Sequence, residues 1–211
     1  MYNWVTHTWS PIQGCSHQCD YCYVKTYRRL PEDPTIDDSF PVLGEGRTIF
    51  IGHMCDMFSA RVPDKWIRRV LDHCKLYNNK YVFQTKNPER ILSFIPDMPA
   101  KYTIGTTVET NRQELLDAIS QAPSVSRRIF GISQITTEKF ITIEPVIQFD
   151  TATFADMIIS ARPNFVNIGA DSKNHNLPEP TRDRVNLLIV LLKTKGIEIR
   201  KKINLERLNN K

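Results

Sequence analysis

The sequence predicts an α/β fold in which parallel strands alternate with helices. Five compact runs are rich in Ile, Val, Phe and Thr, as expected of strands buried on both faces: Thr48–Met54, Tyr81–Thr85, Tyr102–Val108, Lys139–Val146 and Phe165–Ala170. Segments with the apolar spacing of helices separate these runs. Such alternation is typical of right-handed βαβ units, whose loops converge at the carboxyl ends of the strands. We therefore expect the functional site at that end of the sheet.

The helices are predicted from amphipathic spacing and from residues that favour helix ends. Residues Asp64–Tyr77 place their apolar side chains on one side, as a helix packed against a sheet requires. Asn87 followed by Pro88 is typical of an N-cap and first helical residue. Gly196 has the character of a C-terminal helix stop. Three further helices are expected at Gln113–Gln121, Thr151–Ala161 and Thr181–Lys195.

Two more strands are expected near the ends of the chain. One precedes Gly14, and the other spans Ile197–Ile203. With six or seven parallel strands, the sheet can curl into a partial barrel or stay open, and the strand pattern fits both arrangements.

Composition and length indicate one soluble domain spanning residues 1–211. An apolar content of 41% is enough for one sizeable core. No charged and then apolar leader opens the sequence, and the longest apolar run, Leu187–Leu192, is far shorter than the about 20 residues that cross a bilayer. We therefore expect a cytoplasmic protein without membrane contact. The formal net charge of +5 permits an anionic partner such as nucleic acid, but it fits a solvated basic surface as well.

Three of the five cysteines crowd into the segment Gly14–Tyr23, with the spacing C-x3-C-x2-C. An odd number of closely spaced thiols is poorly suited to disulfides and favours metal binding in a reducing compartment. Three thiolates on one loop can hold three irons of a four-iron cluster and leave the fourth iron open to a ligand. The sequence therefore predicts Cys15, Cys19 and Cys22 as ligands of a [4Fe–4S] cluster.

A structural zinc site is the main alternative for these three cysteines. Zinc sites of that kind normally need four protein ligands. Neither His17 nor the distant Cys55 or Cys74 supplies a fourth ligand by local spacing. Cys74 lies on the apolar side of its helix, so we interpret it as a buried core thiol.

The cysteine loop, with the aromatic Tyr21 just before its third cysteine, resembles the cluster loop of the radical S-adenosylmethionine (SAM) superfamily. The longer segment 9–23 is similar to that of a phage and bacterial subgroup of unknown function, itself distantly similar to spore photoproduct lyase, a radical SAM enzyme that repairs DNA. The resemblance covers most of the chain and implies a partial (β/α)6 barrel, with a [4Fe–4S] cluster and SAM as cofactors. A phage-encoded member would act in the host cytoplasm.

The resemblance extends to segments at successive strand ends and implies which residues meet SAM. Segment 52–58 resembles the one that meets the SAM amino group. The family usually has Ser where Cys55 stands, which makes Asp56 the better partner for an ammonium group. Lys86 is similar to a lysine that pairs with the SAM carboxylate. The other residues that the resemblance implies near SAM are Tyr21, Cys55, Thr107, Glu109, Glu144 and Asp171.

Ordinary structural roles are the alternative for these residues. Polar residues at strand ends often cap the next helix. The residues to which this applies are Thr85, Asn87 and Asp171. Glu109 and Glu144 would instead form ion pairs with Lys86 or Arg200. The joint occurrence of charged residues at one strand end after another favours a site.

By the chemistry of the family, the reduced cluster cleaves SAM to methionine and a 5′-deoxyadenosyl radical, which takes a hydrogen atom from a substrate. An external donor such as flavodoxin or ferredoxin supplies the electron. The candidate substrates are a nucleic acid or nucleotide and, equally, a small molecule or peptide. Cys55 is a candidate hydrogen donor to a product radical, although no motif assigns that role to it.

Two other classes of protein are alternatives to the enzyme. A zinc-stabilised nucleic-acid-binding module accounts for the charge and the cysteines but leaves the polar strand ends without a role. An iron–sulfur electron-transfer protein accounts for the cysteines but needs neither Lys86 nor Asp56.

Overall fold

The computed structural model describes residues 2–210 and confirms a parallel α/β sheet. In this part of the chain the main sheet has seven strands in the order β1-β4-β5-β6-β7-β8-β9, and each strand is parallel to its neighbours. The strands are β1 (His7–Trp9), β4 (Thr48–Ile51), β5 (Lys80–Thr85), β6 (Tyr102–Thr107), β7 (Lys139–Ile143), β8 (Phe165–Ile168) and β9 (Glu198–Lys201). A small antiparallel pair, β2 (Ile12–Gln13) and β3 (Thr35–Ile36), lies outside this sheet.

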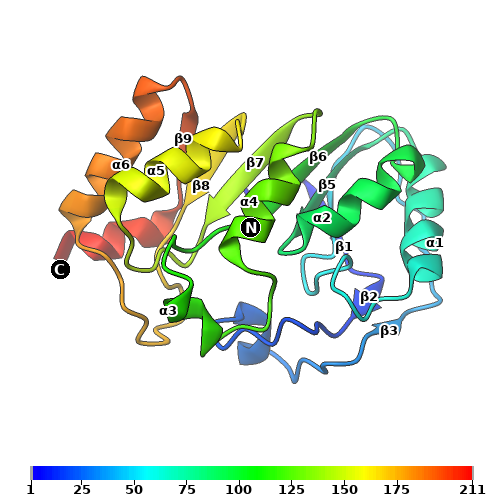
Figure 1. Cartoon of the computed structure of the whole chain (residues 1–211). Coiled ribbons are helices and arrows are strands. Elements are labelled where there is room, and N and C mark those ends of the chain that lie inside the picture. Colours follow the sequence, from blue (N-terminus) through cyan, green and yellow to red (C-terminus); the bar gives the residue numbers. More distant parts are fainter. Residues whose placement is uncertain (1, 211) are drawn as a thin grey trace.

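Helices connect successive strands and cover the outer face of the sheet. In Figure 1, α6, α5, α4, α2 and α1 follow one another across that face in the same order as the strands behind them. The α-helices are α1 (Asp64–Lys75), α2 (Pro88–Ile91), α3 (Glu114–Asp117), α4 (Val125–Ser133), α5 (Thr151–Ser160) and α6 (Arg182–Thr194). Short 3-10 helices are η1 (Tyr23–Thr26), η2 (Leu92–Asp97) and η3 (Ile203–Asn210).

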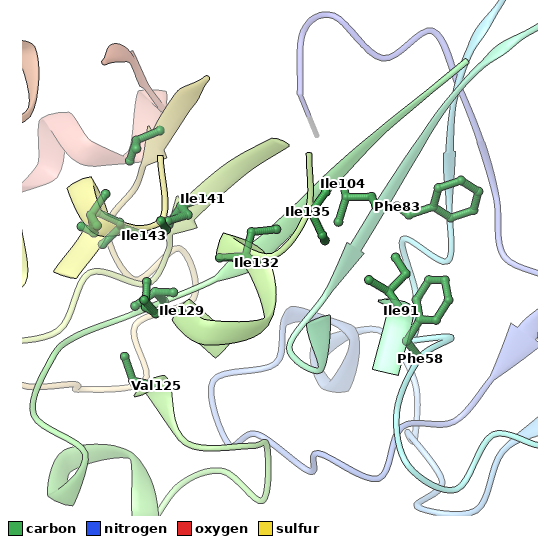
Figure 2. Packing of buried hydrophobic residues seen from close by; sticks show 14 of the residues in the cluster. Phe58, Phe83, Ile91, Ile104, Val125, Ile129, Ile132, Ile135, Ile141 and Ile143 are labelled. Atoms are coloured by element: carbon green, nitrogen blue, oxygen red, sulfur yellow. The ribbon is translucent and has the colours of Figure 1, made fainter. Parts of the chain in front are cut away.

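The main hydrophobic core lies between these helices and the sheet. Figure 2 shows Ile129 and Ile132 of α4 directed toward the strands that carry Ile104 and Ile141. Cys74 is fully buried in α1 and belongs to the same core, so its prediction as a core thiol is confirmed. Burial of one apolar face from each helix is the main force that holds the helices on the sheet.

A second apolar layer lies on the inner face of the sheet. Gly105, Phe140 and Phe165 are direct neighbours on β6, β7 and β8, and the two phenylalanine rings stack with centroids 5.0 Å apart. A Cβ atom on Gly105 would overlap the Phe140 ring, so only glycine leaves the room this ring needs. Tyr2 and Trp4, from the first segment of the chain, pack edge-on against Phe140.

A polar row follows this aromatic layer, two residues nearer to the carboxyl ends of the strands. Thr107, Thr142, Asn167 and Arg200 are direct neighbours across β6, β7, β8 and β9. The hydroxyl of Tyr2 lies 2.6 Å from the Thr142 hydroxyl. Because strand side chains alternate between faces, this row stands on the inner face and forms the base of the region where the loops converge.

Among residues 2–210, α4 is an α-helix that the sequence analysis did not predict, and the short 3-10 helices η1 and η3 were not predicted either. The α4 helix begins after Ser124, whose side chain accepts a hydrogen bond from the Arg127 amide. Two arginines interrupt its apolar spacing and mask the amphipathic pattern, and Gly131 lowers the helix propensity. Conversely, the helix predicted at Gln113–Gln121 shrinks to the four residues of α3.

Several predicted boundaries differ for local reasons. The β4 strand ends at Ile51 because Gly52 has φ +76°, and β7 ends at Ile143, ahead of a proline that has no backbone N–H for the sheet. Asn87 is the N-cap residue of α2 as predicted, but its side chain donates to a carbonyl of a distant loop and makes no capping hydrogen bond. Gly196, with φ +76°, follows α6 as expected of a helix stop.

None of the helices found in residues 2–210 has both the length and the apolar character needed to cross a membrane.

The contact between Gly105 and Phe140 generates a stability prediction. We expect Gly105→Ala to lower the free energy of unfolding by about 1–3 kcal/mol, because the added methyl group displaces the Phe140 ring from a packed layer. Urea denaturation measures this change. The double variant Gly105→Ala/Phe140→Leu should lose less stability than the two single losses combined. Strictly additive losses would show that the ring is not the obstacle.

Candidate functional site

A cavity of about 1040 Å³ opens at the carboxyl ends of the strands, where the sequence places the site. Its wall includes residues that directly follow β4, β5, β7, β8 and β9. The predicted site residues that line it are Cys15, Cys19, Tyr21, Cys22, Cys55, Asp56, Lys86, Thr107, Glu144 and Asp171. Glu109 is fully buried behind this wall and does not line the cavity. The structure therefore brings all but one of these side chains to the same space.

Backbone hydrogen bonds anchor the cysteine loop to the segment that follows α3. Gly14 opens the loop with φ +84°, and a Cβ there would lie 2.7 Å from the carbonyl oxygen of Asp33. The Asp20 amide donates to the carbonyl of Ile119 over 2.9 Å. The Gln121 amide in turn donates to the carbonyl of His17 over 2.7 Å. The segment after α3 thus bends back to hold the loop, which explains why the predicted helix there is short.

All three loop cysteines are free thiols that face the cavity. Cys15 and Cys19 are buried and Cys22 is half-buried. The Cys19 sulfur lies 3.0 Å from the Ser120 hydroxyl and 3.1 Å from Nζ of Lys86. Over residues 2–210, no three Cys, His, Asp or Glu side chains are already grouped as a metal site. The donor set suits a cluster with one open iron, because it offers three thiols on one short loop beside an open space.

Asp56 is buried and already has four hydrogen-bond partners within the protein. Its carboxylate lies 2.8 Å from Nε2 of His17 and accepts from the Thr85 hydroxyl over 3.0 Å, the Lys86 amide over 2.7 Å and the Phe58 amide over 3.0 Å. Burial alone would raise the pKa of Asp56, but the charge of His17 and these hydrogen bonds outweigh it and hold the pKa below its ordinary value. The carboxylate therefore stays ionised and links the cysteine loop to the ends of β4 and β5.

Glu109 is a fully buried carboxylate that joins two cations and a phenol. It accepts from the Tyr21 hydroxyl over 2.7 Å, from Nζ of Lys86 over 2.8 Å and from the guanidinium of Arg128 over 2.7 Å. Burial would raise the pKa of Glu109, but Lys86 and Arg128 more than compensate and lower it to about 2. The ion pair with Lys86 is one of the structural alternatives considered from the sequence, and the structure contains it.

Arg128 is the site-supporting residue that sequence reasoning missed. It is fully buried, and besides Glu109 it donates to the backbone carbonyls of Pro123 over 2.6 Å and Thr107 over 3.1 Å. An arginine inside an unrecognised helix carries no local signal of this role. Its only sequence clue is that a buried carboxylate such as Glu109 needs a cationic partner from another element.

Glu144 and Asp171 also have protein partners at the cavity wall. Glu144 pairs with Lys202 and accepts from Nδ2 of Asn204 over 2.8 Å. The alternative pairing with Arg200 is wrong, because Arg200 instead bonds Glu198 on its own strand over 2.7 Å. Side chains two residues apart on a strand share a face, so this local partner lies within reach.

Asp171 organises the loop that follows β8. It lies 2.7 Å from Nδ1 of His175 and accepts from the Lys173 amide over 3.2 Å. Burial would raise the pKa of Asp171, but the hydrogen bonds from His175 and Lys173 hold it below the ordinary value.

Thr107, in the polar row, accepts from Nε2 of Gln84 over 2.8 Å.

Cys55 lies in the cavity wall after β4 and near the cysteine loop. Burial, and then the negative charge of Asp56, raise the pKa of Cys55 well above its ordinary value. The thiol therefore keeps its proton at neutral pH. An S–H group facing the cavity is the form that hydrogen-atom donation requires.

The buried carboxylate of Glu109 generates a prediction on pH and stability. Its pKa falls from the ordinary 4.5 to about 2 on folding, so its ionisation stabilises the fold above pH 4.5, and that contribution is lost as the pH falls toward 2. At pH 7 we expect Glu109→Gln to lower the free energy of unfolding by about 3–5 kcal/mol, because the buried Arg128 and the partly buried Lys86 lose their partner. Urea denaturation at pH 7 and pH 3 should show this deficit narrowing at the lower pH.

The exposed Glu206 offers a matched control, because Glu206→Gln removes the same charge at the surface. It should leave stability nearly unchanged at both pH values. A deficit of Glu109→Gln that is equally large at pH 7 and pH 3 would contradict the lowered pKa.

The family comparison matches most of the chain. A family described as "Protein of unknown function (DUF5131)" matches residues 1–160. No curated protein matches the sequence.

Solved structures with a similar fold include spore photoproduct lyase, SuiB and a radical SAM methyltransferase. Spore photoproduct lyase complexed with dinucleoside spore photoproduct superposes with a TM-score of 0.57 and 9% identity, over 86% of this chain and 59% of that one. SuiB of Streptococcus suis, bound to the precursor peptide SuiA, superposes with a TM-score of 0.63 and 10% identity, over 98% of this chain and 51% of that one. A radical SAM methyltransferase from Sphaerobacter thermophilus superposes with a TM-score of 0.58 and 12% identity, over 96% of this chain and 67% of that one.

These similarities confirm the partial (β/α) barrel, and this chain spans 59% of the length of the spore photoproduct lyase chain that it matches. From its sequence and its architecture together, the chain belongs to the DUF5131 family and has the fold of the radical SAM superfamily.

Proposed function

We propose that residues 1–211 form a single radical SAM domain, an enzyme whose [4Fe–4S] cluster is held by Cys15, Cys19 and Cys22. The observation that carries this proposal is the set of three free thiols on one loop, all facing a cavity at the carboxyl ends of a parallel sheet. When bound, the cluster supplies the electron that cleaves SAM into methionine and a 5′-deoxyadenosyl radical able to take hydrogen from a substrate. The shared fold supports the same assignment.

The loop must adjust when it takes up the cluster. The three thiols line one cavity but are not grouped around one point, and the Cys19 sulfur is engaged by Ser120 and Lys86. Backbone contacts anchor the loop, so rotation of the Cys15 and Cys22 side chains toward the Cys19 sulfur, which Ser120 and Lys86 already hold, is the simplest way for the thiols to converge. The protein thus supplies a fixed loop with movable ligands.

The cavity wall provides the groups that would orient SAM. Thr107, Glu144 and Asp171 present polar atoms from three successive strand ends, and Tyr21 stands beside the cysteines. Asp56 is the proposed partner of the SAM amino group, at the cost of exchanging one of its present hydrogen bonds. The lining around these groups is largely apolar, which strengthens each electrostatic contact.

The substrate that we propose is a nucleic acid or nucleotide. Lys173 and Lys201 line the cavity, and Nζ of Lys173 lies 4.8 Å from the ring centre of the exposed Tyr27. An exposed aromatic ring next to a cation suits a stacked base with its phosphate. The net charge of +5 and the dinucleoside bound by spore photoproduct lyase point the same way. A cytoplasmic flavodoxin or ferredoxin is the proposed electron donor.

The decisive experiment is anaerobic reconstitution with iron and sulfide. We expect a brown protein that forms 5′-deoxyadenosine from SAM and dithionite. Cys19→Ala should lose the cluster absorbance and at least about 100-fold of the 5′-deoxyadenosine yield, since a ligand is missing. Cys74→Ala, which removes a cysteine buried in α1, should behave like the wild type.

Three results would overturn the proposal. A colourless protein with bound zinc would identify the nucleic-acid-binding module. A cluster that is reduced but inert toward SAM would identify an electron-transfer protein. A Cys19→Ala variant with normal turnover would show that this loop does not hold the cluster.

Cys55 allows a second and independent test of the ligand set. Because it shares the cavity with the loop cysteines, it is the natural fourth ligand of a closed zinc site, whereas a three-cysteine cluster does not need it. We expect Cys55→Ala to keep the full iron content and to cleave SAM at a rate within about twofold of the wild type. A hydrogen donor to the product radical acts only after SAM has been cleaved. Metal analysis and 5′-deoxyadenosine assays measure both. Loss of metal in this variant would favour the four-ligand site.

A further inference from the structure

Lys86 is held by three acceptors at once. Its Nζ atom donates to the Cys19 sulfur over 3.1 Å, to the Tyr21 hydroxyl over 2.8 Å and to the Glu109 carboxylate over 2.8 Å. An ammonium group has three N–H donors, so this set uses all of them. The lysine is a fixed cation at the edge of the cavity.

The acceptors of Lys86 are themselves fixed by buried contacts. Glu109 and Arg128 are both fully buried and lie 2.7 Å apart, and Arg128 is in turn bound to two backbone carbonyls. Glu109 therefore cannot rotate away without leaving Arg128 unpaired, which is costly in the interior. The Lys86 ammonium also lies 4.3 Å from the centre of the Tyr21 ring, within the range of a cation–π contact. The network defines one position for the ammonium, against Cys19.

We propose that Lys86 is a positioning residue for the cluster, held by Glu109 and Arg128 so that its ammonium donates to the sulfur of Cys19 and raises the reduction potential of the cluster. This inference rests on the proposed function, since it takes Cys19 to be a cluster ligand. A hydrogen bond to a ligating sulfur and a nearby positive charge both stabilise the reduced cluster, which carries one more negative charge. The buried pair Glu109–Arg128 acts on the cluster only through Lys86.

This role differs from the SAM-carboxylate contact that the resemblance implies for Lys86. A contact with the carboxylate would require Lys86 to give up one of its three present acceptors. In the arrangement seen, the main effect of Lys86 falls on the cluster and not on the affinity for SAM. The two roles therefore predict different results for the same substitution.

The test compares Lys86→Met with Lys139→Met in the reconstituted protein without SAM. Lys139 is also a buried lysine, but its ammonium donates to the carbonyls of Ile132 and Ser133 at the opposite end of the sheet. We expect Lys86→Met to shift the one-electron equilibrium of the cluster about tenfold toward the oxidised form, or about 59 mV more negative. Lys139→Met should leave the potential unchanged. Redox titration followed by electron paramagnetic resonance measures both.

Lys86→Arg is the conservative variant, because it keeps a cation and N–H donors at the same place. It should restore at least half of the shift in reduction potential that Lys86→Met causes. Iron content and circular dichroism show whether each variant folds and assembles a cluster, and Lys86→Gln replaces Lys86→Met if the latter fails to fold.

The outcomes separate this inference from the proposed function. An unchanged potential in Lys86→Met with a complete cluster, together with SAM binding weakened more than about tenfold, would overturn the inference and leave the enzyme assignment intact. A wild-type chain that assembles no cluster would overturn the proposed function itself. A lowered potential with SAM affinity within about threefold of the wild type would support the role of Lys86 at Cys19.

Discussion

The site depends on one buried carboxylate. Glu109 projects from the segment after β6 and is the point at which the cysteine loop, the end of β5 and helix α4 meet, through Tyr21, Lys86 and Arg128. Two cations and a hydroxyl around one carboxylate compensate the cost of burying the charges. No single element could satisfy this group alone, so the four segments must assemble together. The order of the cavity wall follows from that requirement.

Much of the fold follows from local pattern. The buried β-branched runs at Tyr81–Thr85, Tyr102–Val108 and Phe165–Ala170 lie on strands of the sheet, and the helix expected at Thr181–Lys195 matches α6 closely. Alternation of strand and helix then restricts the topology to a parallel sheet. These features depend on residues close in sequence, which is why periodicity reveals them. The α4 helix was missed because its amphipathic pattern is diluted by polar residues and glycine.

The sequence could predict which residues lie near one another at the site, but not which of them form ion pairs and hydrogen bonds. Strand order and direction bring Cys55, Lys86 and Glu144 to one cavity, since each follows a parallel strand. Which acid faces which base depends on side-chain reach between elements far apart in sequence. Thus Arg200 was expected near Glu144 but bonds Glu198, and Arg128 was not expected at all. Spacing also does not show whether a carboxylate such as Asp56 is free for a ligand or already engaged.

The inner aromatic layer bears on how the chain reaches its native state. Tyr2 contacts Phe140 and Thr142, so residues almost at the start of the chain complete a layer built by strands about two thirds of the way along it. Contacts between residues so far apart in sequence carry a loop-closure entropy cost, and they require both segments to be present. During synthesis the first residues must wait until β7 and β8 have left the ribosome before they can dock. The inner aromatic layer, and with it the base of the cavity, is therefore complete only after β8 has been synthesised.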